Sequence, residues 1–600
     1  MSLSAIVSAD SPHARSPRAS RNAIFVCALL LIAFGLLCYL AVSTKSATAD
    51  EPLHVTGAYA HVFMRDYRLN PEDPPLWNYW VMLPRSHDSL HLPTDHELWR
   101  KQLDDTSWEM PYSSIVLFTA QNDGARFIQS SRPMMVVLGV ALGALIACWA
   151  WQVAGRIGAI VATTLFAFDP NLLAHAALVK NDVAFALVMT AMCFAVWRVG
   201  RRATLLNVAS AAIALGAAMT TKFSGVLLAP MLVAMISARA LVPSEWLVVG
   251  RPMRTARSKL LAATMICAVV AIVSWAMIWL AYGFRFDATP DPGSRLPTAR
   301  MVTRTAEERF FVRHNRWPSE AELKVADPGL IAHATTWAER HHLLPQAWLY
   351  GFLYTYQSTL VRTSFLLGRF SETGWWYYFP LAMAFKTPIS TIGACVIALV
   401  VALLKPRHPE RYSANDLASI DKPDPSRSTA QDDMLRSVSR SWTLICMLIP
   451  IAIYMASAMT TNLNLGLRHV LPVYPIIYLL IAMAASRLAS LRPRIFKWSA
   501  IVLGVALVAE SVVAFPNYIA FFNAPSRPYR LHLLSDSNLD WGQDLLALSR
   551  WQAEHPSTRL YLCYFGSVDP AVYGINYINL PGGTYLNNEQ QAPDQRGVIA

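Results

Sequence analysis

A series of long apolar runs constrains the fold of this chain more than any other feature. Several runs of about 20 residues contain almost no charged side chain, and a helix of that length crosses a hydrocarbon core roughly 30 Å thick. Hydrophobic residues make up 54% of the 600 residues and charged residues only 15%, which excludes an ordinary soluble globular protein. We therefore predict an all-α polytopic membrane protein with about eleven spans. The predicted spans are roughly 24–43, 132–152, 157–173, 182–199, 204–220, 223–241, 259–283, 377–404, 441–460, 468–487 and 497–515.

Basic residues predict the orientation of these spans, because loops rich in Lys and Arg stay on the cytoplasmic side. The N-terminal tail, the turn at 198–202, the segment 251–259 and the start of the link 405–440 are basic, and all fall on one side when the spans are threaded in order. We expect residues 1–23 to be a cytoplasmic tail, and the Ala- and Arg-rich usage indicates a bacterial plasma (inner) membrane. The net charge of +12 then reflects topology and attraction to membrane lipids, and we expect no nucleic-acid partner.

The longer polar segments mostly fall on the opposite, outward side. The region 24–515 holds a first outward loop at 44–131 and a second at 284–376, and residues 516–600 form an outward C-terminal segment. There "RLYLCYFGSV", "NYINLPGGTYL" and "RGVIA" read as strands, the last cut short, which predicts a small α/β segment in a truncated chain. The long cytoplasmic link 405–440 is polar, and we expect it to be disordered. Elaborate loops on one face indicate that the chemistry lies on that face.

An acidic pair follows the first predicted span. In "ADEPLHVTGAYAH", Asp50 and Glu51 are adjacent, and His54 and His61 follow Asp50 at successive offsets of four and seven, near one face of a helix. A carboxylate held against a membrane surface can keep a raised pKa and serve as a general base. The spacing alone favours a solvated helix start, where acidic residues are common.

Two other acidic stretches stand out. In "RLNPEDPPLWNYW", Glu72 and Asp73 precede a rigid Pro-Pro elbow and aromatic residues that suit a membrane interface. Taken alone, this stretch fits an interfacial loop. In "LLSDSNLDWGQDL", Asp536, Asp540 and Asp544 share one face if the segment is helical. A capped surface helix explains that spacing better than a calcium site, because the EF-hand pattern is absent.

Charged residues also stand at the outward ends of later spans, where they are costly unless they are paired or functional. Lys386, in "AFKTP", is predicted about a third of the way into its span and therefore needs an anionic partner. Lysines at span ends can also reach lipid phosphates by snorkelling. A polyprenyl phosphate would supply an anion at this depth, gripped by Arg and Lys. The residues are Lys180, Asp182, Lys222, Lys386, Arg468 and His469.

In order from about residue 50 to 550, these blocks resemble a known family. It comprises bacterial integral-membrane glycosyltransferases of the protein O-mannosyltransferase and aminoarabinose-transferase type, and within it the phospholipid carrier-dependent glycosyltransferases. The ordered set is specific for the family but not for a substrate. The blocks are "ADEPLHVTGAYAHVFMRDYRLNPEDPPLWNYWVMLP", "DPNLLAHAALVKND", "TKFSGVLLAP", "GWWYYFPLAMAFKTP", "NLGLRHVLPVYP", "FPNYIAFFNAP" and "LLSDSNLDWGQDL".

The resemblance implies a GT-C bundle with its active site on the outward, periplasmic or extracellular face. The family's catalytic acid falls on Asp50 with Glu51 beside it, and its second acidic position falls on Glu72 or Asp73. Many relatives carry His or Lys immediately before Pro-Pro-Leu, where this chain has Asp73. Many also carry small or hydroxyl residues at the position of Lys180 and the residue after it.

The function implied is a hexosyl or pentosyl transfer from a polyprenyl-phosphate donor to a protein, lipid or glycan acceptor, with inversion at the anomeric carbon. Asp50 would act as the base, while Lys386, Arg468 and Lys222 would stabilise the leaving phosphate. No cofactor is certain, and a divalent metal on His54, Glu72 or Asp73 is an open expectation. The residues expected to bind substrate are Glu72, Asp73, Lys180, Asp182, Lys222, Lys386, Arg468 and His469.

The main alternative is a transporter or flippase for a lipid-linked sugar, which would bind the same phosphate with the same cations. Such a protein is expected to show inverted repeats and helices broken at mid-membrane. The sequence shows neither, and its long loops favour one face. A non-catalytic scaffold would leave Lys386 and the acidic pair Asp50 and Glu51 unexplained.

Overall fold

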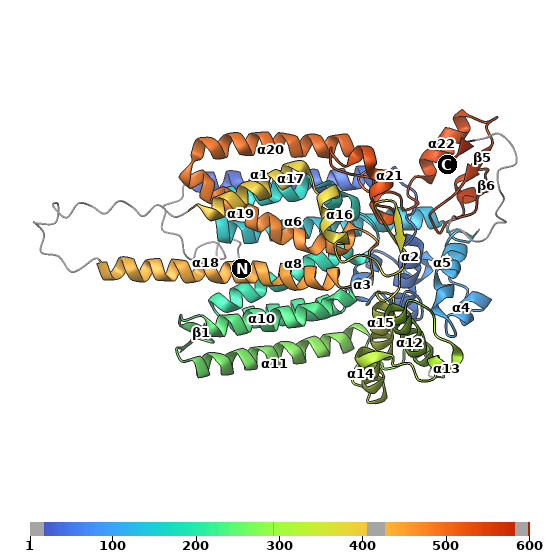
Figure 1. Cartoon of the computed structure of the whole chain (residues 1–600), viewed down its shortest axis with the longest axis horizontal. Coiled ribbons are helices and arrows are strands. Elements are labelled where there is room, and N and C mark those ends of the chain that lie inside the picture. The colour runs from blue at the N-terminus through green and yellow to red at the C-terminus, as the bar shows by residue number, and fades with distance from the viewer. Residues whose placement is uncertain (1–16, 120, 292, 405–425, 583–597) are drawn as a thin grey trace, which may run out of the picture.

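The apolar runs form a bundle of long helices that lie side by side in the computed structural model of the chain (Figure 1). The structure describes residues 17–119, 121–291, 293–404, 426–582 and 598–600, with the backbone alone described at 426–440. Among these residues, eight helices are long and apolar enough to cross a membrane, or nine if one bent pair counts as a span. The chain is therefore a polytopic, mostly helical membrane protein, as predicted.

The bundle contains ten labelled α-helices, and short 3₁₀ segments lead into two of them. The α-helices are α1 (Pro17–Val42), α6 (Gly124–Ala167), α8 (Asn181–Arg201), α9 (Leu205–Met219), α10 (Leu228–Leu241), α11 (Ala256–Ala281), α17 (Ile389–Leu403), α18 (Ser426–Met459), α19 (Tyr474–Leu491) and α20 (Pro493–Ala514). The 3₁₀ segments are η5 (Phe223–Leu227), before α10, and η6 (Leu467–Val473), before α19.

The predicted spans 132–152 and 157–173 lie largely within one labelled helix, α6, which reverses direction at Gly155. This glycine has φ 67° and ψ −162°, outside the helical region. A Cβ added at Gly143 would lie 2.5 Å from the ring of Phe166, although a straight helix would separate these residues by about 35 Å. The two halves of α6 therefore fold back on each other.

Two other predicted spans take forms that their composition did not show. The run 204–220 forms α9, whose 15 residues extend only about 22 Å, less than the thickness of a hydrocarbon core. The run 377–404 is broken into α16 (Tyr378–Lys386) and α17, which meet at 110°. The break falls at Pro388, whose ring cannot continue a helix. Lys386 thus ends a short helix and does not lie within a continuous span, which corrects the predicted position.

The first and second loops and the C-terminal segment gather at one end of the bundle, which we call the outer end (Figure 1). The first loop contains α2 (Glu51–Tyr59), the π-helix η2 (Ala60–Met64), α3 (Leu76–Met82), η3 (His87–Ser89), α4 (Glu97–Lys101), η4 (Thr106–Trp108) and α5 (Glu109–Leu117). The second contains α12 (Thr298–His314), α13 (Glu320–Leu323), α14 (Gly329–Arg340), α15 (Gln346–Gln357), β3 (Ser364–Leu366) and β4 (Arg369–Ser371). Leu173 and Ala174 of the short α7 (Pro170–His175) lie beside Ala41 and Val42 at the end of α1. The hairpin of β1 (Trp246–Val248) and β2 (Arg251–Met253) lies at the opposite end of the bundle.

The C-terminal segment contains the small α/β unit that the alternating sequence predicts. Its elements are η7 (Arg527–Tyr529), α21 (Arg530–Leu533), η8 (Asp536–Asn538), α22 (Leu545–Glu554), β5 (Leu560–Leu562), η9 (Pro570–Tyr573), β6 (Ile578–Asn579) and β7 (Val598–Ile599). The strands are parallel in the order β6-β5-β7, with Tyr561 paired to both Ile578 and Ile599. Residues 583–597 lie outside the described part of the chain.

Two local predictions are wrong. The segment 533–545 is not one capped helix, because Asp536 and Gly542 adopt positive φ values of 57° and 79° and turn the chain. Its acidic residues have separate roles, since the Asp540 carboxylate accepts from the amide of Gly542, and Asp544 pairs with Lys45. In the link 405–440, α18 begins at Ser426, so the later part is helical. Residues 405–425 of that link and 1–16 of the tail lie outside the described residues.

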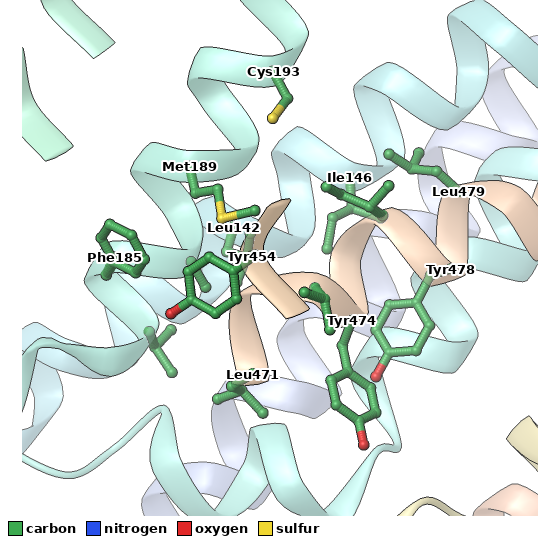
Figure 2. Packing of buried hydrophobic residues seen from close by; sticks show 14 of the residues in the cluster. Leu142, Ile146, Phe185, Met189, Cys193, Tyr454, Leu471, Tyr474, Tyr478 and Leu479 are labelled. Carbon is green, nitrogen blue, oxygen red and sulfur yellow. The ribbon is translucent and has the colours of Figure 1, made fainter. Parts of the chain in front are cut away.

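The core of the bundle lies where α6, α8, α18 and α19 meet, and Figure 2 shows its packing. Leu142, Phe185 and Met189 are fully buried there, and Tyr474 and Tyr478 add aromatic rings. Small residues let neighbouring helices approach closely, since a Cβ on Gly143 would lie 2.4 Å from Leu31 of α1. Close backbone approach at small residues is typical of helices packed within a membrane.

We predict that Gly155→Ala destabilises the protein by about 1–3 kcal/mol, because only glycine adopts this backbone conformation without strain. A Cβ at this position would meet no atom within 4 Å, so the cost is conformational and not steric. Gly504→Ala in α20 is the matched control, since that site is equally open and has no positive φ. The thermal unfolding midpoint in detergent should fall for Gly155→Ala and stay equal or rise for Gly504→Ala. Equal midpoints for both variants would contradict a reversal that requires glycine.

Candidate active site

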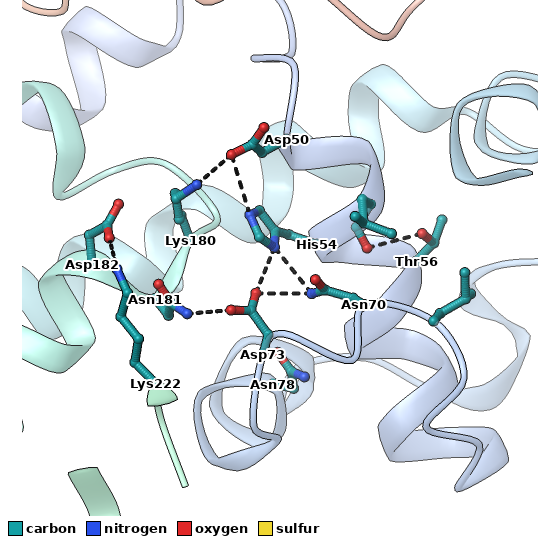
Figure 3. A network of polar contacts seen from close by, with 12 residues as sticks. Asp50, His54, Thr56, Asn70, Asp73, Asn78, Lys180, Asn181, Asp182 and Lys222 are labelled. Carbon is teal, nitrogen blue, oxygen red and sulfur yellow. Dashed lines mark hydrogen bonds and ion pairs between the residues drawn. The ribbon is translucent and has the colours of Figure 1, made fainter. Parts of the chain in front are cut away.

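Asp50 lies at the outer end of the bundle, where the chain leaves α1 and enters α2. Lys180, directly before α8, forms an ion pair with Asp50 Oδ2 (Figure 3). Arg468 of η6 contacts the same oxygen through Nη1 at 3.2 Å. The Asp50 side chain is 27% exposed, whereas Lys180 and Arg468 are 11% and 6% exposed. Segments far apart in the sequence therefore bring two largely buried cations to one accessible carboxylate.

Trp541 forms a fully buried aromatic surface beneath these cations. The Lys180 Nζ lies 4.6 Å from the centroid of this ring, and the Arg468 guanidinium carbon lies 4.1 Å from it. The amide of Ala49 donates to the carbonyl of Trp541, which ties the ring to the turn before Asp50. The sequence block "LDWGQDL" was noted for its acidic residues, and the role of its tryptophan was missed. Cation–π contact holds the charged groups in place without neutralising them.

A second hydrogen-bonded group lies beside Asp50. The His54 Nδ1 is 2.7 Å from Asp73 Oδ2, and the side-chain amide of Asn70 donates to the same oxygen at 2.9 Å. Asn181, the first residue of α8, donates to the other oxygen of Asp73 (Figure 3). The His54 Nε2 is buried without a hydrogen-bond partner, 4.0 Å from Asp50 Oδ2. Asp73 therefore orients the imidazole so that its open nitrogen faces Asp50.

Glu51 has a different environment from Asp50, although the two residues are adjacent. Its carboxylate forms an ion pair with Arg132 of α6 at 2.6 Å, and both side chains are 1% exposed. The amides of Thr48 and Val179 donate to its two oxygens at 2.9 and 3.1 Å. Both oxygens are thus hydrogen-bonded and shielded from solvent. In this geometry Glu51 fixes the loop, and its sequence-based assignment as a second catalytic acid gains no support.

Two other predicted cations, Lys222 and Lys386, have partners other than Asp50. Lys222 pairs with Asp182 at 2.5 Å beside the Asp50 group. The Lys386 Nζ donates to the carbonyls of Ile519 and Asn538 at 2.9 and 2.5 Å. Lys386 therefore has backbone oxygens as its hydrogen-bond partners, where the sequence predicted an anionic one. Next to Arg468, His469 has a buried Nε2 without a hydrogen-bond partner.

Two buried carboxyl groups, those of Glu72 and Glu109, lie close to Asp73 and Asn70. One oxygen of Glu72 is buried without a partner. Glu109 accepts from the amide of Asn70 at 3.0 Å and from the hydroxyl of Tyr354 at 3.3 Å. Burial, followed by the charge of Asp73, raises the pKa of Glu72 to about 7. Burial and the neighbouring Glu72 also hold the pKa of Glu109 well above its usual range. These two acids can therefore retain protons near neutral pH.

Asp50 does not have the raised pKa that its position at a membrane surface predicted. Burial alone would raise the pKa of Asp50, but the charges of Lys180 and then His54 outweigh that effect and lower it. Arg362, an exposed residue before β3 that sequence reasoning missed, also lowers it. Asp50 is therefore ionised at neutral pH, and its negative charge is shared with cations.

The described residues contain no group of three His, Cys, Asp or Glu side chains arranged to hold a metal ion. Of the candidates His54, Glu72 and Asp73, only His54 and Asp73 are in direct contact. His61, which the sequence pattern places on one helix face with Asp50 and His54, has its two ring nitrogens bonded to Leu69 and Asn78. The divalent metal thus stays an untested expectation.

No protein-family model and no curated protein matches this sequence. Several solved structures resemble the chain weakly, among them the following three. ArnT from Cupriavidus metallidurans bound to undecaprenyl phosphate is 11% identical, with 92% of this chain and 85% of that chain covered and a TM-score of 0.29. The Archaeoglobus fulgidus oligosaccharyltransferase tethered to an acceptor peptide is 10% identical, with 91% and 62% covered and a TM-score of 0.34. Arabinosyltransferase EmbB from Mycobacterium smegmatis is 13% identical, with 81% and 43% covered and a TM-score of 0.22. At these TM-scores the similarity is too weak to assign a family or a function to this chain.

We predict that Arg132→Met destabilises the protein by about 3–5 kcal/mol, because it leaves the Glu51 charge buried without a partner. The double variant Glu51→Met/Arg132→Met should recover most of that loss, since no isolated charge remains. Arg126→Met, at an exposed position of the same helix, should leave the unfolding midpoint unchanged. A double variant no more stable than Arg132→Met would refute this account of the pair.

Proposed function

We propose that the protein is a membrane glycosyltransferase that moves a sugar from a polyprenyl-phosphate donor to an acceptor at the outer end, with inversion. One observation carries this proposal. An accessible carboxylate, Asp50, shares two largely buried cations, Lys180 and Arg468, at the mouth of several apolar helices. A lipid-linked phosphate is an anion that can enter from the bilayer at this depth. The family resemblance of the sequence blocks supports the same chemistry.

The two cations suit the charge change of this reaction. The donor phosphodiester carries one negative charge, and the departing lipid monophosphate gains a second as the bond to the sugar breaks. Arg468 offers further N–H donors beyond the one that contacts Asp50, and its Nε is buried without a partner. Lys180 supplies a point charge. Once the donor phosphate is bound, these cations, supported by the Trp541 ring, stabilise the charge that develops in the chemical step without further reorganisation. Lys180 and Arg468 therefore take the role that the sequence had assigned to Lys386, Arg468 and Lys222.

Asp50 serves as the base in this proposal, and donor binding controls its strength. In the resting site Lys180 lowers the pKa of Asp50 and makes it a weak base. A donor phosphate that draws Lys180 and Arg468 to itself weakens that effect, so the pKa of Asp50 rises when the donor is in place. The base is thus activated only when a leaving group is present.

The chemical step is a single displacement. The acceptor oxygen or nitrogen attacks the anomeric carbon and forms the new glycosidic bond. The bond from that carbon to the phosphate oxygen breaks, and its electron pair stays on the phosphate. The acceptor proton moves to Asp50, from which the His54 Nε2, 4.0 Å away and otherwise unpartnered, can accept it. The products are the glycosylated acceptor and the polyprenyl phosphate.

Several finer features belong to the same proposal. The outer end faces the periplasm or the cell exterior, and the N-terminus is cytoplasmic, because the basic loops lie at the other end. The sugar is a hexose or a pentose, and the acceptor is a protein, a lipid or a glycan. Glu72, Asp73, Asp182, Lys222 and His469 line or flank the site and are proposed to contact the substrates. A divalent metal would use His54, Glu72 or Asp73.

A transporter of a lipid-linked sugar is the competing function. The structure does contain one broken helix, α16–α17, which the sequence had not revealed. Figure 1 places α16 across the outer end of α17, whereas transporter sites use helices broken near the bilayer midplane. The position of this break therefore does not favour transport.

We predict that Asp50→Asn lowers the rate of sugar transfer by about 10²–10⁴-fold, the usual contribution of a general base. Asp88→Asn is the control, because that side chain is 99% exposed in the same loop and should keep full activity. The assay follows radiolabelled polyprenyl-phosphate sugar in proteoliposomes with candidate acceptors. Label that crosses the bilayer unconsumed, independently of Asp50, would indicate a transporter instead.

A second prediction concerns the acid limb of the pH profile. Lys180 lowers the pKa of Asp50, so Lys180→Gln should raise that pKa and shift the acid limb of kcat/KM to higher pH by about 1–3 units. Asp50 must be ionised to accept a proton. As the pH falls, the variant should therefore lose activity at a higher pH than the wild type. An acid limb that does not move would show that the limb belongs to another group.

A further inference from the structure

A large cavity opens at the outer end of α1 and α20, against the C-terminal segment. Its volume is about 1120 Å³, slightly above the roughly 300–1,000 Å³ typical of small-molecule pockets. The last turns of α20 form one wall, Thr44 and Lys45 directly after α1 add to it, and the segment 516–530, Asp544 and α22 form the rest. Nothing in the proposed transfer reaction uses this cavity.

The cavity is divided into an apolar wall and a basic rim. Val513, Ala514 and Phe522 are among the apolar side chains that line it. Arg527 and Arg530, both exposed, belong to the lining as well, and Arg550 of α22 adds a third exposed guanidinium. Apolar wall and basic rim together match an amphiphile with an anionic head group.

The acidic residues of the lining contact other groups and form no ion pair with these arginines. Glu510 accepts from the amide of Ile389 at 2.9 Å and from the hydroxyl of Ser390 at 2.7 Å. Asp544 is paired with Lys45 at 2.6 Å.

Within the described residues, none of the three arginines forms an ion pair with a carboxylate. The Arg550 Nε donates at 3.2 Å to the carbonyl of Leu546 in its own helix, and the Arg530 Nη1 reaches only the carbonyl of Arg527, at 3.5 Å. The rim therefore presents positive charge that an external anion can meet.

The cavity adjoins the bilayer. The span α20, which forms one wall, and the span α1, which ends beside the cavity, are the least buried of the candidate spans, with 11% and 22% of their windows buried. Beside the rim, Tyr529 and Leu531 are 66% and 75% exposed. Exposed Tyr and Leu next to Arg are typical of the level where lipid head groups lie.

The chain segment 541–545 separates this cavity from the Asp50 site. On one side the Trp541 ring contacts Lys180 and Arg468, and on the other Asp544 lines the cavity. The segment is fixed to the loop after α1, because Ser46 donates through its amide to the carbonyl of Gln543. The two sites are therefore adjacent but distinct.

We propose that this cavity binds an anionic phospholipid from the surrounding bilayer. Its phosphate meets Arg527, Arg530 and Arg550, and its chains run along Val513 and α20 into the hydrocarbon region. The bound lipid covers the outer face of the segment that supports Trp541. This site is independent of the proposed transfer reaction.

The test is native mass spectrometry of the full-length protein released from nanodiscs made of phosphatidylglycerol or of phosphatidylcholine. We expect one retained phosphatidylglycerol and no retained phosphatidylcholine. In titrations with phosphatidylglycerol, Arg527→Gln/Arg530→Gln/Arg550→Gln should bind roughly 100-fold more weakly, given the usual contribution of basic residues at a lipid surface. The control Arg313→Gln/Arg340→Gln/Arg369→Gln removes three exposed arginines that do not line the cavity and should retain the lipid.

Three results would overturn the proposal. Equal retention of both lipids would indicate an apolar groove only. Equal loss of binding in the two triple variants would indicate a general surface effect. Unchanged retention by Arg527→Gln/Arg530→Gln/Arg550→Gln would show that these arginines do not bind the lipid. Unfolding midpoints for all variants show whether the protein remains folded. Because binding is measured without any sugar donor, this test and the transfer assay can fail separately.

Discussion

The buried ion pair between Glu51 and Arg132 fixes the geometry on which the outer site depends. Two charges removed from water are stable together only when their hydrogen bonds are completed. Arg132 also donates to the carbonyls of Val42 and Ser46, and Glu51 accepts from the loop before α8. One pair therefore joins the exit of α1 to α6 and to the approach to Lys180. The neighbouring Asp50 is left at a defined position with its side chain accessible.

The rest of the site is determined by the charges around Asp50, which lie close to the low-dielectric interior of the membrane. Asp50 balances only one of the two positive charges around it, and the ring of Trp541 contacts both cations. In the proposed mechanism, a phosphate that binds these cations changes the charge balance at Asp50 and so prepares it to accept a proton. In this mechanism, donor binding and the activation of Asp50 both occur when Lys180 and Arg468 exchange Asp50 for the phosphate as their partner.

The sequence predicted the features that depend on local composition. The apolar runs, the strands of the C-terminal segment and the candidate residue Asp50 required only periodicity, length and neighbouring blocks. It could not distinguish Asp50 from Glu51, because that difference arises from Arg132, 81 positions away. Likewise, the hydrogen-bond partners of Lys386 are backbone carbonyls brought close by folding, and no side-chain pattern announces them. Trp541 was overlooked for the same reason.

The most direct test of the central claim is an experimental structure of the protein in lipid nanodiscs with a polyprenyl monophosphate bound. We predict phosphate density between Lys180 and Arg468, next to the Trp541 ring, with the contact between Lys180 and Asp50 opened. Phosphate density elsewhere, with the contacts of Asp50 to Lys180 and Arg468 intact, would contradict the assignment of these cations as the donor site.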